Sequence, residues 1–291
     1  MLKNESTVRN VKSGGSFFGA ADRQQFGFMQ AASRPDRNTV ATLICPPIGH
    51  EYYRTHWATR RLATTLSRNH THVFRFDYCG VGDSAGDFCE VKSIEELMHD
   101  AHVALTELVS LTGTEKVNVI GLRTGANIAA ALPGCCRVEN LILWEPEICG
   151  AGYVEQWRSM HHPMIDLWMT KLETENSETF EEILGTRFTK SFLNELESFE
   201  FGNRDDLDCE SVSVFCSKSQ DSPESPEWRS RGYDPVYVDD QNDWSKLKNI
   251  EIAWLPSEGT RAIANRLKST QVSSSQVEYA ANVESEVTVT Q

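Results

Sequence analysis

The sequence predicts an α/β protein whose central sheet is mostly parallel and flanked by helices. Short apolar runs at 40–45, 72–77, 116–120 and 138–144 alternate with longer segments of helical periodicity. Several of these runs are apolar at nearly every position, which is typical of strands covered on both faces. Strands that alternate with helices are joined by crossover connections, and these place the strands parallel in one sheet.

Composition limits the classes of function. The 291 residues are 40% hydrophobic, enough for one large domain core. The formal net charge of -14 argues against nucleic acid as a partner. No apolar run approaches the roughly 20 residues that a membrane span needs. The N-terminal residues are polar and lack the apolar region of a signal peptide, so we expect a cytoplasmic protein.

The eight cysteines include no Cys-x-x-Cys pair, and no secretory signal precedes them. We therefore expect free thiols rather than a disulfide or zinc framework. His99 and His102 share one helical face, but no third ligand accompanies them. The sequence indicates no metal and no cofactor.

In the first half of the chain, local sequence signals mark where the predicted helices and strands begin and end. Ser93 and Glu96 form a capping box that begins a long helix, and Gly113 ends it. We expect, in order, a disordered segment at 1–15, an antiparallel hairpin at 16–32, a strand at 40–45, a helix at 53–69, a strand at 72–77 and a helix from 93 to 113.

The second half is less regular. We expect a strand at 138–144, a helical lid insert at 151–200 with helices at 153–172 and 179–199, and a strand at 211–216. Alternatively, these two helices pack wholly into the core. A polar loop at 217–245 follows, in which short structure could form around Tyr233 to Val238, then a last strand at 250–255, a final helix at 261–267 and a disordered tail at 269–291. One domain therefore covers 16–268.

The central motif is Gly121-Leu122-Arg123-Thr124-Gly125, between an apolar run and a helix of small residues. The glycines suit a sharp strand-turn-helix elbow, because a strained turn leaves no room for a nearby Cβ. The spacing is that of Gly-x-Ser-x-Gly, but Arg123 stands where the serine belongs. A guanidinium is cationic and is not a nucleophile.

Polar residues cluster where the predicted strands end. Ligands of parallel sheets bind beyond the carboxyl ends of the strands. The residues that meet this condition are Ile48–Glu51, Asp77–Ser84, Arg123–Thr124, Glu145 and Asp221.

These motifs, in this order and spacing, resemble the α/β-hydrolase superfamily. Within it, the chain is similar to the bacterial exosortase A system-associated hydrolases of type 2. That likeness covers roughly 40–160 and includes Gly121-Leu122-Arg123, which those relatives share. The resemblance implies an α/β-hydrolase fold with a small helical lid, a hydrolase of the acyl or ester class, and a setting near polysaccharide export.

The catalytic triad of that superfamily is incomplete in this sequence. Its order is serine, then an acid, then histidine. Asp221 is the candidate acid, although a loop aspartate also caps turns. No histidine lies beyond His162, so the usual position of the base, at 256–260, holds none. The backbone N–H groups of Ile48, Gly49 and His50 could still form an oxyanion hole.

Arg123 needs an anion, because its charge lies at the positive end of a helix. It could pair with an internal carboxylate from Glu51, Glu145 or Asp221. Alternatively, Arg123 could bind a ligand carboxylate or phosphate together with Thr124 and the backbone donors. The acidic residues expected nearby favour the internal pair.

Three hypotheses follow. The first is a degenerate hydrolase, or pseudoenzyme, that binds an anionic or acyl-type ligand. The second is an active esterase-like or acyltransferase-like enzyme with a non-standard nucleophile. The third is a non-catalytic protein partner in bacterial polysaccharide or exosortase-type biosynthesis.

Overall fold

The computed structural model describes residues 10–36, 39–114, 116–132, 137–168, 178–207, 209–218, 226–240 and 242–270. Their central feature is an eight-stranded sheet in the order β1-β2-β4-β3-β5-β6-β9-β10. β1 and β2 form the antiparallel hairpin at one edge, and β2 pairs antiparallel with β4. All the other pairs are parallel, which confirms the predicted fold class.

The strands of this sheet are β1 (Gly14–Phe18), β2 (Gln25–Gln30), β3 (Ala41–Cys45), β4 (His72–Phe76), β5 (Lys116–Leu122), β6 (Arg137–Trp144), β9 (Ser211–Ser217) and β10 (Val236–Val238). The helices are α1 (His50–Arg68), α2 (Ile94–Thr112), α3 (Thr124–Ala130), α4 (Gly150–Trp168), α5 (Lys190–Ser198), α6 (Pro226–Ser230) and one over 257–270. The short 3-10 helices are η1 (Phe88–Glu90), η2 (Arg204–Asp206) and η3 (Leu247–Asn249).

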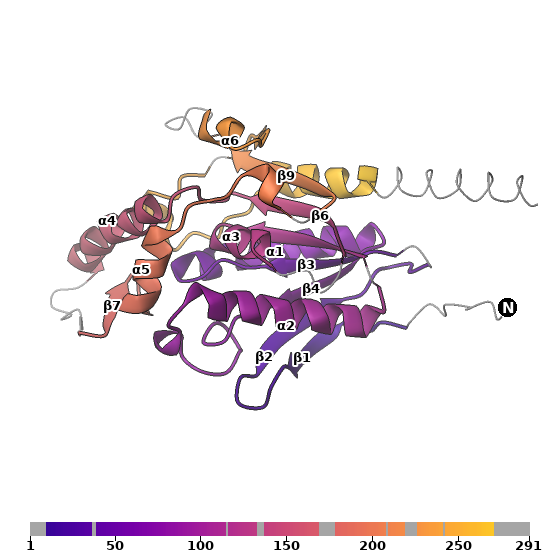
Figure 1. Cartoon of the computed structure of the whole chain (residues 1–291), viewed down its shortest axis with the longest axis horizontal. Coiled ribbons are helices and arrows are strands. Elements are labelled where there is room, and N and C mark those ends of the chain that lie inside the picture. The colour runs from indigo at the N-terminus through magenta and orange to yellow at the C-terminus, as the bar shows by residue number, and fades with distance from the viewer. Residues whose placement is uncertain are drawn as a thin grey trace, which may run out of the picture.

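The two faces of the sheet have separate apolar cores. Along β3, Leu43 packs on the face that α2 and α3 cover, whereas Ile44 packs with α1 and the 257–270 helix. This division follows from the two-residue period of a strand. Because both faces are buried, β3 is apolar at almost every position. In Figure 1, α2 lies across one face of the sheet, with β1 and β2 at the lower edge.

The predicted end signals of α2 are confirmed. The Ser93 hydroxyl accepts from the N–H of Glu96, and Gly113 ends the helix in a left-handed conformation. The Glu96 carboxylate accepts from the N–H of Lys92 rather than that of Ser93, at 2.9 Å. No helix in the described part of the chain combines the length and apolarity that crossing a bilayer requires.

The helix predicted over 179–199 is wrong in its first half. That half forms a hairpin of β7 (Phe180–Ile183) and β8 (Thr186–Thr189), and only α5 is helical. Leu184 and Gly185 both have positive φ, 51° and 79°, as in a two-residue hairpin turn. In Figure 1, α4, β7 and α5 lie together beyond one end of the sheet, where the sequence predicts a lid.

The last strand was also misplaced. Residues 250–255 form turns and irregular backbone. The sheet instead ends with β10, which lies in the part of the polar loop, Tyr233 to Val238, where short structure is predicted. Ile252 is 58% exposed, so the apolar alternation around it does not mark a buried face. The predicted disordered ends fall mostly outside the described residues. Within the described part, β1 already begins at Gly14 and the final helix continues through 269–270.

Candidate functional site

The elbow has the geometry that its glycines predict. Arg123 lies between β5 and α3 at φ 55° and ψ -126°, and its N–H donates to the Trp144 carbonyl at 2.9 Å. A Cβ on Gly121 would lie 2.3 Å from the Cα of Ala126, and one on Gly125 would lie 2.3 Å from the Cys45 carbonyl oxygen. The chain therefore requires glycine on both sides of Arg123.

The guanidinium of Arg123 is held inside the protein. Its Nε and Nη2 donate to Oε1 of Glu51 at 3.0 and 2.9 Å. Nη1 forms an ion pair with Glu147 and donates to the Glu145 carbonyl at 3.4 Å. The Tyr153 hydroxyl donates to the other oxygen of Glu51. Arg123 is only 3% exposed, so its charge is compensated by the protein itself.

Charge pairing outweighs burial at Glu51 and Arg123, whereas at Glu147 burial outweighs the pairing and raises the pKa above its usual value. Burial alone would raise the pKa of the Glu51 carboxyl, but Arg123 and the hydrogen bonds to it hold that pKa below its usual value. Burial alone would lower the pKa of Arg123, whereas Glu147 and Glu51 raise it well above the ordinary value. Glu51 is therefore ionised and Arg123 protonated at neutral pH.

The residues of the predicted oxyanion loop take part in hydrogen bonding and helix formation within the protein. The Ile48 N–H donates to the Thr124 hydroxyl at 3.2 Å. Gly49, at φ 62°, is the N-cap of α1. His50 and Glu51 belong to the first turn of that helix, which begins three residues before the predicted start at Tyr53. Glu51 consequently projects from a helix rather than from a mobile loop.

The candidate acids have different surroundings. The Glu145 carboxylate accepts from the N–H and the hydroxyl of Ser217 at 2.6 and 2.5 Å, and does not pair with Arg123. Burial raises the pKa of Glu145 above its usual value despite these bonds. Asp221 lies outside the described residues. Of the three carboxylates predicted as partners of Arg123, Glu51 is therefore the one seen to pair with it.

Sequence reasoning missed three members of the site. Glu147 follows β6 at the same sheet edge as Glu145, and that position could have indicated it as a second partner. Tyr153 begins the first predicted helix of the lid, and its ring centroid is 5.0 Å from Cζ of Arg123. Trp244 lies 4.5 Å from the same atom, although the sequence around it is polar. No local pattern identifies Trp244 as part of this site.

The loop where the superfamily carries its base has a structural role here. Asp240 accepts from the N–H groups of Glu258 and Gly259 at 3.0 and 2.5 Å, which caps the 257–270 helix. Nearby, Trp244 packs against Trp254, and Trp254 packs against Trp144. Indole rings thus occupy this region, and they cannot accept a proton as an imidazole does.

The remaining polar groups are poorly suited to nucleophilic catalysis. His50 is buried against Trp157, with ring centroids 5.7 Å apart, and burial lowers its pKa to about 4. Burial raises the pKa of the Cys45 thiol well above its usual range and that of Cys79 to about 12. A thiol without a depressed pKa is a weak nucleophile.

Aromatic side chains of the predicted lid segment pack in series above the cluster. The ring centroids of Tyr153 and Trp157 are 4.4 Å apart, and Trp157 stacks on Phe188 at 5.4 Å. Phe188 in turn stacks on Phe192. These rings come from α4, β8 and α5, so the segment covers the buried ion pairs with an apolar layer.

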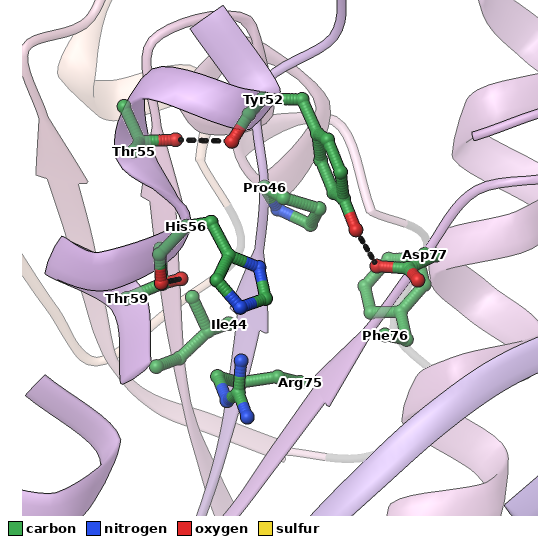
Figure 2. Close-up of a pocket in the computed structure, with 9 residues that line it drawn as sticks. All are labelled: Ile44, Pro46, Tyr52, Thr55, His56, Thr59, Arg75, Phe76 and Asp77. Carbon is green, nitrogen blue, oxygen red and sulfur yellow. Dashed lines mark hydrogen bonds between the residues drawn. The ribbon is translucent and has the colours of Figure 1, made fainter. Parts of the chain in front are cut away.

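Of the predicted Asp77–Ser84 group, Asp77 lines a small pocket between α1 and the end of β4. Figure 2 shows the Tyr52 phenol directed at Asp77, with an O–O distance of 2.7 Å, and His56 on the Arg75 side of the pocket. Its cavity of about 20 Å³ has room for one water molecule. Within the described residues, no group of three or more His, Cys, Asp or Glu side chains could hold a metal ion.

Comparisons with known proteins agree with this architecture. Residues 48–187 match the family model of serine aminopeptidase, S33. A putative hydrolase from Agrobacterium vitis S4 is 18% identical, with a TM-score of 0.54 over 89% of this chain and 99% of its own. The ferulic acid complex of Est1E from Butyrivibrio proteoclasticus is 10% identical, with a TM-score of 0.55 over 89% and 98%.

A third structure, the α/β hydrolase GrgF from Penicillium sp. sh18, is 13% identical, with a TM-score of 0.52 over 78% of this chain and 90% of its own. No curated protein matches the chain significantly. At these identities the structural likeness concerns the fold. Together with the family match and the parallel sheet, it shows that the chain has the α/β-hydrolase fold.

Proposed function

We propose that this protein is a hydrolase-fold binding protein that does not hydrolyse esters at its elbow. The observation that carries the proposal is the position of Arg123. Its guanidinium replaces the attacking hydroxyl and is bound to Glu51 and Glu147. Acyl transfer needs a nucleophile within hydrogen-bond reach of a base. The cluster offers neither group at the apex.

The cluster also limits what Arg123 can bind. An anionic ligand at the guanidinium would have to displace Glu51 or Glu147, and displacement of Glu51 would leave a buried carboxylate without its partner. Breaking a buried ion pair costs about 3–5 kcal/mol. We therefore assign Arg123 a structural role, and an acyl or anionic ligand is expected elsewhere on the molecule.

An unorthodox nucleophile has less support. Thr124 is next to the apex, but its hydroxyl accepts from the Ile48 N–H at 3.2 Å, and no imidazole is recorded within hydrogen-bond distance of it among the described residues. A threonine hydroxyl without a base is unreactive at neutral pH. The geometry of the described site therefore favours the binding role over an esterase or acyltransferase.

The test is a search for turnover. The intact protein is incubated with a fluorophosphonate probe and, separately, with p-nitrophenyl butyrate, beside an active serine esterase. We expect no covalent labelling and no turnover above the rate of an equal mass of albumin. Labelling at one probe per chain, abolished by a single Ser, Thr or Cys substitution, would overturn the proposal.

The resemblance to exosortase A system-associated hydrolases supports bacterial polysaccharide biosynthesis as the setting of this role. A strain that lacks the protein should then export less polysaccharide. Wild-type protein and a Thr124→Val variant should restore export equally at equal protein levels, because the role requires no hydroxyl at this position. The levels are matched because the change leaves the buried Ile48 N–H without its acceptor. Unchanged export in the deletion strain would remove the support for this setting.

A further inference from the structure

A second cleft lies beside the ion-pair cluster but does not include Arg123. It has a volume of about 340 Å³ and is bordered by Arg54 of α1 and by residues 239–240, 242, 249 and 252–257. This volume is within the range of small-molecule sites. Trp244 separates the two regions, because its ring centroid is 4.4 Å from Cζ of Arg54 and 4.5 Å from Cζ of Arg123.

Two buried donors at this cleft lack acceptors. Arg54 is only 6% exposed, and its Nη2 donates to Oδ1 of Asn242 at 2.5 Å. Its Nε and the Nδ2 of Asn242 are both buried without a hydrogen-bond partner in the described part of the chain. Such groups are rare in folded proteins, because each unsatisfied buried donor destabilises the fold. An oxygen-bearing ligand would relieve this destabilisation.

Arg54 has no carboxylate within ion-pair distance of its guanidinium among the described residues. The charges of Glu51, Asp243 and Glu145 compensate it only from further away. Burial lowers its pKa to about 10, which still leaves it cationic at neutral pH. Arg123, by contrast, has two carboxylate partners. A buried cation without a direct ion-pair partner is the feature of this cleft that best indicates a ligand carrying an acceptor oxygen.

The rim of the cleft is mixed, and its large exposed aliphatic side chains come from two residues. Ile252 and Leu255 line it and are 58% and 57% exposed. Asp239 and Asp240 also line the cleft. The two oxygens of Asp240 are bound to the N–H groups of Glu258 and Gly259, whereas Asp239 is exposed. The wall thus combines the donors of Arg54 and Asn242 with exposed aliphatic side chains and one exposed carboxylate.

We propose that this cleft binds an acyl compound of medium chain length. Its carboxylate or carbonyl oxygen would accept hydrogen bonds from Arg54 and Asn242, and its hydrocarbon chain would lie along Ile252 and Leu255. This inference rests on the binding role proposed above, because it gives that role a site. It involves no covalent step.

Calorimetric titration of the full chain tests the site with octanoate, octanamide and octylamine as probes. We expect octanoate or octanamide to bind and octylamine not to bind. The stronger of the first two identifies the head group as carboxylate or neutral carbonyl. Absence of binding by both oxygen-bearing probes, or equal binding of the amine, would overturn the proposal.

Asn242→Asp is the decisive variant, since it preserves the shape of the side chain. The new carboxylate would pair with Arg54 and repel octanoate, so we expect at least tenfold weaker binding. Leu255→Ser should also weaken binding, and this residue is exposed enough for the fold to tolerate the change. Asn203→Asp adds the same charge at an exposed position outside the cleft and should bind like wild type.

Unchanged octanoate affinity in Asn242→Asp would refute the site. Turnover of p-nitrophenyl octanoate tests the proposed function separately from the cleft. Hydrolysis of that ester would contradict the proposed absence of catalysis, but the titrations alone would still decide whether the cleft binds octanoate. Failure of octanoate and octanamide to bind would refute the cleft assignment and leave the conclusion about the elbow unaffected.

Discussion

Nε and Nη2 of Arg123 converge on a single oxygen of Glu51, at 3.0 and 2.9 Å, and Tyr153 binds the other oxygen. Both members of the pair are almost fully buried. A serine at this position is neutral and needs no carboxylates to compensate a buried charge. The substitution at the elbow is therefore accompanied by a set of residues that compensate its charge, which distinguishes it from an isolated loss of the serine.

Glu51→Gln should destabilise the protein by about 3–5 kcal/mol, because it leaves Arg123 with a neutral group at its most buried contact. Glu147→Gln is the matched comparison and should cost about 1.5 kcal/mol. The Glu147 side chain is 28% exposed, so water can replace part of its bond. Urea unfolding at pH 7 measures both. Equal losses would contradict the ranking of the two partners.

Arg123→Ser should not create a hydrolase, since no imidazole is available to activate the hydroxyl. It should also destabilise the protein, because Glu51 and Glu147 lose their counter-charge. Adding Glu51→Gln and Glu147→Gln removes those charges, and the triple variant is checked for folding by circular dichroism. Turnover of p-nitrophenyl butyrate should stay at background in both. Serine-dependent turnover in either would show that a base had been overlooked.

His50 should make the protein less stable in acid. Its folded pKa is about 4, against an ordinary value of 6.5, so the unfolded chain binds more protons between these values. The free energy of unfolding should therefore fall as the pH drops from 6.5 to 4, by about 3 kcal/mol from this residue. Glu51, whose folded pKa is lowered, contributes its own loss below its usual 4.5.

The measurement is urea unfolding at several pH values for wild type and His50→Phe, which keeps a ring against Trp157. The variant should lose the part of the slope between pH 4 and 6.5. His70→Asn is the control, because His70 is exposed and its φ of 64° suits asparagine. An unchanged slope in His50→Phe would show that other groups cause the acid dependence.

Patterns of short range allowed much of the fold to be predicted. The apolar strands, the Ser93 cap and the Gly121 and Gly125 elbow each depend on a few neighbouring residues, and the structure confirms them. The hairpin at 180–189 was missed because its apolar spacing also fits a helix. The positive φ of Leu184 and Gly185 distinguishes the hairpin from a helix.

The site was predicted less completely, because its contacts cross long stretches of chain. Glu51 was among the expected partners since it follows the first parallel strand. Trp244 lies far from Arg123 in sequence and follows polar residues, so no periodicity indicates that its ring packs on two guanidinium groups. The unpartnered Nε of Arg54 is likewise a property of packing alone.

The elbow itself should tolerate no added methyl group beside Arg123. In Gly125→Ala the new Cβ would lie 2.3 Å from the Cys45 carbonyl oxygen and 2.4 Å from that of Pro46. Both are backbone atoms of a buried segment that cannot move independently of the sheet. We expect a loss of at least about 3 kcal/mol in the free energy of unfolding, at the upper end of the cost of overpacking.

Gly152→Ala in α4 is the matched control, because nothing lies within 4 Å of its Cβ position. It should be neutral or stabilise the protein by about 0.5 kcal/mol, since alanine favours the helix over glycine. Urea unfolding of the two variants decides the point: similar stabilities would mean that β3 and α3 do not approach each other as closely as the elbow geometry requires.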